Sequence, residues 1–133
     1  MARNVMTLVA VVTLASWSGS AAARGPGAST NDRVYTAAQA AKGQELYAQV
    51  CETCHQPAKF TGAEFTRAFV GRSLSEIDHA MAEMPADNPG SLTSDDVAAL
   101  IAYFLQMNEY PAGETPLSGE PAALKSIMVS PRP

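Results

Sequence analysis

The sequence predicts a small all-α domain. Two segments, residues 36–50 and 93–107, carry apolar side chains at the i, i+3, i+4 and i+7 spacing of amphipathic helices. No two alternating apolar runs flank a hairpin turn, so we expect no substantial sheet. The 133-residue chain is long enough for one compact domain and too short for two comfortable ones.

The first 23 residues are predicted to be a secretory signal peptide, in which Arg3 precedes an apolar run over residues 5–15. Ala21 and Ala23 occupy the positions of an A-x-A site, which predicts cleavage just after Ala23. The apolar run of about 11 residues is short against the roughly 20 needed to span a bilayer, which disfavours an uncleaved anchor. We therefore expect a periplasmic protein that meets a membrane only transiently, during export or partner docking.

Residues 24–35 are mostly small or polar and predict a flexible leader before a domain over residues 36–108. The first helix of that domain, residues 36–50, carries Gly43 on its apolar face together with Leu46, Tyr47 and Val50. Glycine costs helix stability, so Gly43 predicts the close approach of another backbone at this face.

Two shorter helices are expected in the middle of the domain. After a loop over residues 56–63, a short helix over residues 63–69 carries two phenylalanines. The second short helix, residues 73–82, ends before Pro85, because a proline disfavours helical geometry at the preceding residue. Its start has capping-box spacing in two registers, Ser73 with Glu76 and Ser75 with Asp78.

The helix over residues 93–107 has the clearest signature of all. Thr93 and Asp96 have capping-box spacing, and the apolar stripe follows at Val97, Leu100, Ile101, Phe104 and Leu105. Residues 109–133 then hold five of the nine prolines. We expect them to form a C-terminal extension that wraps the domain surface, with one or two helical turns within residues 122–128.

Both cysteines lie in one C-x-x-C-H run, at Cys51, Cys54 and His55, which is the attachment signature of c-type haem. The two thiols add across the vinyl groups of one porphyrin, and the adjacent imidazole reaches the iron. Other readings are weaker, because a thioredoxin-like site needs a βαβ context and a structural zinc site needs four ligands where only His79 is spare. A structural disulfide would give His55 no role. The motif therefore predicts one covalently attached haem c.

Met84 is the predicted sixth ligand of the iron, because it lies in a turn and Pro85 stiffens the loop that would present its sulfur. Among the alternatives, Met81 fits the buried face of a helix, His79 fits its polar face, and Met107 has no loop to move it. A His/Met pair raises the reduction potential and blocks the binding of small molecules. The pair predicts one-electron transfer at an exposed haem edge.

These features resemble the class I cytochrome c family over roughly residues 36–127. The later motifs are similar to those of small bacterial cytochromes c that occur as subunits or fused domains of periplasmic dehydrogenases, including quinoprotein alcohol dehydrogenases. They are Gly71-Arg72-Ser73-Leu74, Met84-Pro85, Pro89-Gly90-Ser91-Leu92-Thr93, Ala102-Tyr103-Phe104-Leu105, Asn108 and Pro111-Ala112-Gly113.

The resemblance implies a cytochrome c fold of three to four short helices around one haem. It implies that the first and last helices cross, near Gly43 and Tyr47 on one helix and residues 100–104 on the other. It also implies thioether links at Cys51 and Cys54, with His55 as proximal and Met84 as distal ligand.

Two positions depart from the family pattern. Where relatives have a Gly-Pro whose carbonyl holds the proximal imidazole, this chain has Thr61-Gly62. Where many relatives have a tryptophan that bonds a haem propionate, it has Phe69, which has no donor. Arg72 or Tyr103 are candidates for that bond, although a solvated surface position is the simpler interpretation of Arg72.

We therefore expect a mono-haem electron carrier, not an enzyme, that passes electrons from a dehydrogenase to a downstream cytochrome or oxidase of a respiratory chain. The alternatives are a haem enzyme or gas-binding cytochrome with a labile sixth ligand, and a haem-free adaptor held by a disulfide. With 9 basic and 13 acidic residues and a net charge of −4, the chain gives no support to a nucleic-acid partner. An acidic carrier would steer towards a basic face on a redox partner.

Overall fold

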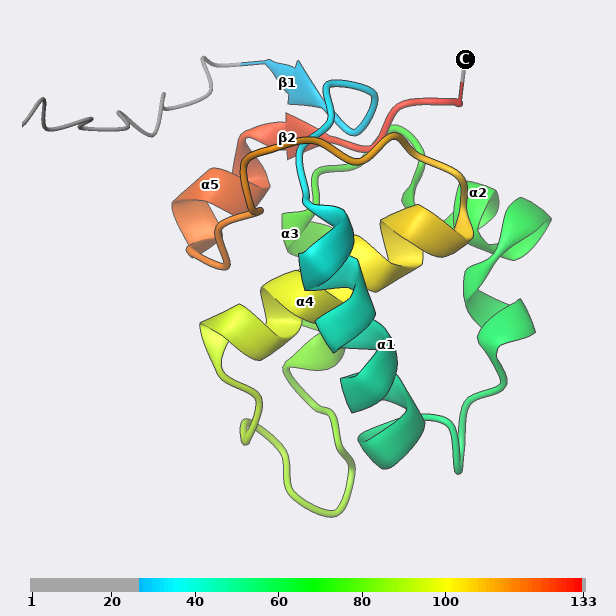
Figure 1. The fold of residues 1–133 in the computed structure, drawn as a ribbon. Coiled ribbons are helices and arrows are strands. Elements are labelled where there is room, and N and C mark those ends of the chain that lie inside the picture. Colours follow the sequence, from blue (N-terminus) through cyan, green and yellow to red (C-terminus); the bar gives the residue numbers. More distant parts are fainter. Residues whose placement is uncertain (1–26, 133) are drawn as a thin grey trace, which may run out of the picture.

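A computed structural model describes residues 27–132, and the predicted signal peptide lies outside this range. The described chain is mostly helical, as the sequence predicts (Figure 1). Its elements in order are β1 (Ala28–Ser29), α1 (Ala37–Val50), the short 3₁₀ helix η1 (Pro57–Phe60), α2 (Gly62–Phe69), α3 (Ser75–Met81), α4 (Ser94–Met107), α5 (Pro121–Lys125) and β2 (Ile127–Met128).

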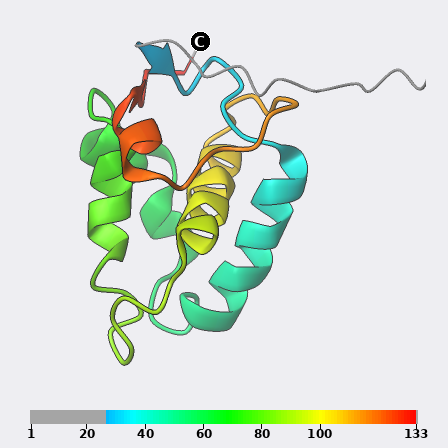
Figure 2. The ribbon, with the colours of Figure 1, turned by 90° about the vertical axis from the view of Figure 1, so that its left-hand side faces the viewer.

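Helices α1 and α4 pack against each other and cross, which confirms the expected contact of the first and last helices of the domain (Figures 1 and 2). Gly43 lies at the crossing. A Cβ atom at this position would lie 1.9 Å from the carbonyl oxygen of Ala99 and 2.5 Å from its carbonyl carbon. The absence of a side chain at Gly43 therefore sets how closely the two backbones approach.

Helix α4 begins with the predicted capping box. The Thr93 hydroxyl accepts from the backbone N–H of Asp96 at 3.2 Å, and the Asp96 carboxylate accepts from the backbone N–H of Thr93 at 3.2 Å. Most of the helix is buried, because it runs through the middle of the hydrophobic core. α4 is thus the element against which the others pack.

The capping box predicted for the third helix is wrong in both registers. α3 begins at Ser75, its N-cap is Leu74, and no side chain caps it. Ser73 instead exchanges a 2.6 Å hydrogen bond with the Ser75 hydroxyl. The Ser73 hydroxyl is thereby engaged, and Ser75 already lies inside the helix, so neither serine is an N-cap. The residues before α3 are paired with residues 127–129 through backbone hydrogen bonds, which connect Gly71 N to Val129 O, Val129 N to Arg72 O, and Leu74 N to Ile127 O.

The two ends of the described chain meet beside α3 and α5. β1 and β2 form a parallel pair in which Ala28 lies opposite Ile127, a contact that periodicity did not predict because each strand has two residues. The described part of the expected flexible leader differs from that expectation, because Val34 and Tyr35 are fully buried. Val34 and Tyr35, the two large apolar residues of this stretch, thus belong to the hydrophobic core.

The C-terminal segment contributes several core side chains. Leu117, Leu124, Ile127 and Val129 are all buried. Gln39 of α1 holds the segment through two hydrogen bonds to Leu117, each of 2.8 Å. Within residues 27–132, no helix is long and apolar enough to cross a membrane.

Candidate functional site

The C-terminal end of α1 presents the C-x-x-C-H run in one tight turn. Cys51 is the C-cap, and its N–H donates to Tyr47 O at 2.9 Å. The N–H groups of Cys54 and His55 both donate to the carbonyl of Cys51, at 3.1 and 2.9 Å. The turn therefore keeps both thiols and the imidazole within a few residues of the helix end. Cys51 is half-buried and Cys54 is exposed, and the two form no disulfide with each other.

An apolar cavity of about 150 Å³ opens beside this turn. The end of α1 and the segment over residues 85–93 lie at the same end of the molecule (Figures 1 and 2). The cavity is lined by Tyr47, Cys51, His55, Phe60, Phe69, Ile77, Ala80, Met81, Met84, Leu92, Leu100 and Phe104. One thiol, one imidazole and two thioether sulfurs thus share a single apolar space, which is a donor set that suits haem iron.

The four candidates for the sixth ligand differ in their position relative to this cavity. Met84 and Met81 line it, whereas His79 and Met107 do not. His79 is exposed, as predicted, and Met107 is half-buried against the core. Met84 lies in the turn after α3, where its N–H donates to Met81 O at 2.9 Å, and Met81 belongs to the buried face of the helix.

Tyr47, a buried residue of α1, stabilises the C-x-x-C-H turn through a hydrogen bond. Its hydroxyl donates a hydrogen bond to the main-chain carbonyl of His55. Burial, and then the nearby Cys51, raise the pKa of Tyr47 to about 12, and burial also raises the pKa of the Cys51 thiol. Sequence reasoning placed Tyr47 on the apolar face of a helix and missed this polar role. Its position four residues before Cys51, one helical turn away, is the signal that was available.

Phe60 packs on the side of His55. The two ring centroids lie 5.7 Å apart in an edge-on arrangement. Phe60 also stacks on Phe104, with centroids 4.8 Å apart and an interplanar angle of 12°. Sequence reasoning placed Phe60 in a loop and gave it no role, because the contact depends on where the loop folds.

Phe69, which stands where many relatives have a tryptophan, lines the cavity. Arg72 is exposed, and its guanidinium Nη1 lies 3.9 Å from the carboxylate Oε2 of Glu76, in agreement with a solvated surface position. Tyr103 does not line the cavity and packs against Tyr47, with ring centroids 5.5 Å apart.

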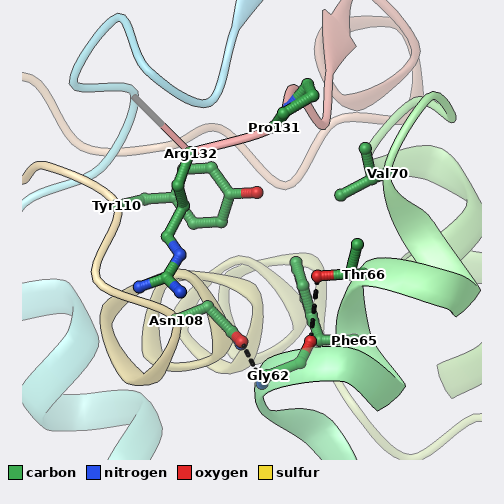
Figure 3. Close-up of a pocket in the computed structure, with 8 residues that line it drawn as sticks. All are labelled: Gly62, Phe65, Thr66, Val70, Asn108, Tyr110, Pro131 and Arg132. Atoms are coloured by element: carbon green, nitrogen blue, oxygen red, sulfur yellow. Dashed lines mark hydrogen bonds between the residues drawn. The ribbon is translucent and has the colours of Figure 1, made fainter.

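A second cavity, of about 240 Å³, lies between α2, the end of α4 and the C-terminal segment (Figure 3). Its polar groups are already engaged within the fold. Asn108 Oδ1 accepts from Gly62 N, and Thr66 Oγ1 donates to Gly62 O, both at 2.9 Å. Arg132 pairs with Glu109. None of Cys51, Cys54, His55 and Met84 lines this cavity, which is therefore separate from the C-x-x-C-H site.

Comparison with protein families identifies the domain. A family model described as cytochrome c oxidase, cbb3-type, subunit III matches residues 38–104, half of the chain. The chain belongs to this family of class I cytochromes c. No curated protein and no solved structure gave a significant match.

Membership of the family settles the cofactor and the general activity. This cytochrome binds covalent haem c, and its C-x-x-C-H run carries the two cysteines that such attachment requires. Cytochromes of this kind transfer electrons, work with redox protein partners and are typically extracytoplasmic. The cytochrome c fold expected from the resemblance is confirmed.

Proposed function

We propose that this cytochrome is a periplasmic mono-haem electron carrier that takes single electrons from a dehydrogenase and passes them to a downstream cytochrome or oxidase. Cys51 and Cys54 form the thioethers, His55 is the proximal ligand and Met84 is the distal one. The observation that carries the proposal is that Cys51, His55 and Met84 line one apolar cavity. When bound, haem supplies a one-electron iron couple at this place.

The residues around the cavity have distinct roles in this proposal. The apolar lining excludes water from the iron, which favours the less charged ferrous state. The thioether of Met84 is a soft ligand that also favours ferrous iron, and it closes the sixth position to small molecules. Together they make a carrier of raised potential rather than a site for catalysis on bound substrates.

The proposal extends to the chain as a whole. Residues 1–23 direct export and are removed near Ala23, and residues 36–108 form the haem-binding domain. Residues 24–35 and 109–133 flank that domain as leader and extension. A description of the family as an oxidase subunit agrees with an oxidase or its cytochrome as the acceptor.

Haem attachment is tested by a pyridine haemochrome assay on protein made together with haem-maturation machinery. We expect one haem per chain and its loss when both cysteines are replaced by alanine. A chain that matures without haem, or with a Cys51–Cys54 disulfide, would contradict the proposal.

The distal ligand is tested by comparing Met84→Ala with Met81→Ala, since both sulfurs line the cavity. Met84→Ala should lower the reduction potential and abolish the sulfur-to-iron charge-transfer absorption of the ferric protein, whereas Met81→Ala should keep that absorption. Rapid binding of carbon monoxide by the unmodified ferrous protein would instead favour a gas-binding cytochrome with a labile ligand. The reverse result for the two variants would assign the ligand to Met81.

A further inference from the structure

Asn108, the C-cap of α4, is a buried polar residue with only 6% of its surface exposed. Its Nδ2 group donates to the carbonyl oxygens of Phe60 and Phe104, each at 2.8 Å. Its Oδ1 atom accepts from the N–H of Gly62 at 2.9 Å, and Figure 3 shows the side chain directed at Gly62. Both amide hydrogens and one oxygen lone pair are therefore used.

Two of the three partners of Asn108 belong to the segment over residues 60–62, which joins η1 to α2. Gly62 is the first residue of α2, and the N-cap Thr61 makes no side-chain capping bond. The amide oxygen of Asn108, which belongs to a different helix, instead accepts from the first N–H of α2, that of Gly62. The same side chain donates to the carbonyl of Phe60. Asn108 therefore bonds both the first and the last residue of the segment to the end of α4.

The segment over residues 60–62 includes Phe60, whose ring contacts the imidazole of His55. Phe60 lies between Phe104, on which it stacks, and His55, which it meets edge-on. With its carbonyl held by Asn108 and its ring held by Phe104, Phe60 has a defined position against the imidazole. A path of direct contacts therefore leads from Asn108 through Phe60 to His55.

We propose that Asn108 is a positioning residue for the proximal haem ligand and acts through Phe60. The proposal rests on the assignment of His55 as an iron ligand. Packing of Phe60 restricts rotation of the imidazole about its bond to the iron, and Asn108 keeps Phe60 in place. Loss of the hydrogen bonds from Asn108 to residues 60–62 should widen the range of imidazole orientations and so change the electronic structure of the iron.

The test compares Asn108→Ala, Asn108→Asp and a control, Gln39→Ala, in the haem-loaded protein. Aspartate keeps an acceptor for Gly62 N but has no donor for Phe60 O. Gln39 is a matched control, because its amide also forms two hydrogen bonds with a distant backbone, that of Leu117. Gln39 does not line the apolar cavity beside the C-x-x-C-H turn. Both Asn108 variants should shift and broaden the paramagnetically shifted proton resonances of the His55 ring in the ferric protein. Both should also move the reduction potential, while Gln39→Ala should lower stability only.

Phe60→Leu keeps an apolar side chain and removes the aromatic contact, so it should change the His55 resonances in the same way. In that background, Asn108→Asp should have little additional effect, because the path to the imidazole is already broken. If both Asn108 variants fail to fold, Phe60→Leu still tests the contact between Phe60 and His55 on which the proposal depends, and unchanged His55 resonances in it overturn the proposal.

The proposal is overturned if the His55 resonances and the potential stay unchanged in the Asn108 variants or in Phe60→Leu. It is also overturned if Gln39→Ala moves them equally, because the effect would then be general destabilisation. Failure of the proposed function would be seen in the unmodified protein, which would lack a haem-ligated His55 signal altogether.

Discussion

Tyr47 shows how a single residue supports the haem-attachment turn from the core. The side chain is 2% exposed, its ring packs among Phe60, Tyr103 and Phe104, and its hydroxyl bonds the carbonyl of His55. Position and chemistry are therefore combined in one side chain. The ring belongs to the crossing of α1 and α4, while the hydroxyl reaches the end of the C-x-x-C-H run.

We predict that Tyr47→Phe lowers the free energy of unfolding by about 1–2 kcal/mol, because it leaves the carbonyl of His55 without its partner. Tyr103→Phe is the matched control, since its ring packs at the same crossing and no hydrogen bond of its hydroxyl occurs in the described part of the chain. The control should change stability by about 0.5 kcal/mol or less. Urea unfolding of the haem-loaded proteins measures both, and equal losses would contradict the role of the hydroxyl.

Gly43 is the other residue on which the crossing depends. Gly43→Ala gains about 1 kcal/mol of helix propensity but drives a Cβ atom to 1.9 Å from Ala99 O. Because the obstructing atoms belong to backbone, we expect the clash to dominate and the net loss of stability to reach about 3 kcal/mol. Thermal unfolding should show this loss. Gln44→Ala, at an exposed position on the same helix, should show almost none.

At the scale of elements, whether a side chain caps a helix depends on the hydrogen bonds that the residues before the helix already make. Thr93 and Asp96 form a capping box at the start of α4, whereas the Ser73 hydroxyl is bonded to that of Ser75 and makes no cap for α3. The same sequence spacing therefore gives a cap in one place and none in the other.

The capping box of α4 makes a pH-dependent contribution to stability. The hydrogen bond from the Thr93 hydroxyl, the bond from its backbone N–H and the nearby Lys42 lower the pKa of Asp96. Since the folded pKa lies below the unfolded one, the stabilisation is present above the unfolded value and is lost as the pH falls through the folded value. We expect Asp96→Asn to cost about 1 kcal/mol at neutral pH.

This difference between the unmodified protein and Asp96→Asn should shrink as the pH falls below about 4. Chemical unfolding at a series of pH values measures it. Asp95→Asn is the control, because Asp95 lies in the first turn but takes no part in the capping box, so its loss should be smaller. A pH-independent cost of Asp96→Asn would show that the charge contributes nothing.

At the scale of the whole molecule, residues 27–35 of the leader and residues 109–132 at the C-terminal end are parts of one packed structure. Tyr35 donates to Tyr110 O at 2.7 Å, Gly113 N donates to Tyr35 O at 2.7 Å, and β1 pairs with β2. α5 packs against α3 and buries Leu124 completely. Among the described residues, neither 27–35 nor 109–132 line the cavity beside the C-x-x-C-H turn, so we expect them to act mainly on the stability of the fold.

We therefore predict that Leu124→Ala lowers the free energy of unfolding by about 3 kcal/mol through cavity formation and leaves the reduction potential unchanged. Met128→Ala, 40% exposed and four residues further on, should cost about 0.5 kcal/mol or less. Denaturant unfolding and redox titration of the same samples test this separation. A shifted potential in Leu124→Ala would show that the C-terminal segment influences the haem site directly.

Features that depend on neighbouring residues could be predicted from the sequence. Helices α1, α3 and α4 follow from apolar periodicity, the Thr93–Asp96 box follows from a three-residue spacing, and haem attachment follows from five consecutive residues. The close approach at Gly43 was also predictable, because a glycine on the apolar face of a helix requires a physical reason.

Tertiary structure alone decided what depends on distant segments. The bonds from Asn108 to residues 60–62, the ring of Phe60 against His55, and the pairing of β1 with β2 join parts of the chain that no local pattern relates. Such contacts follow from how whole helices pack, and packing depends on the shapes of all the side chains at once. The sequence by itself therefore determined that haem c is attached, whereas only the folded chain decided which side chains surround the proposed iron ligands.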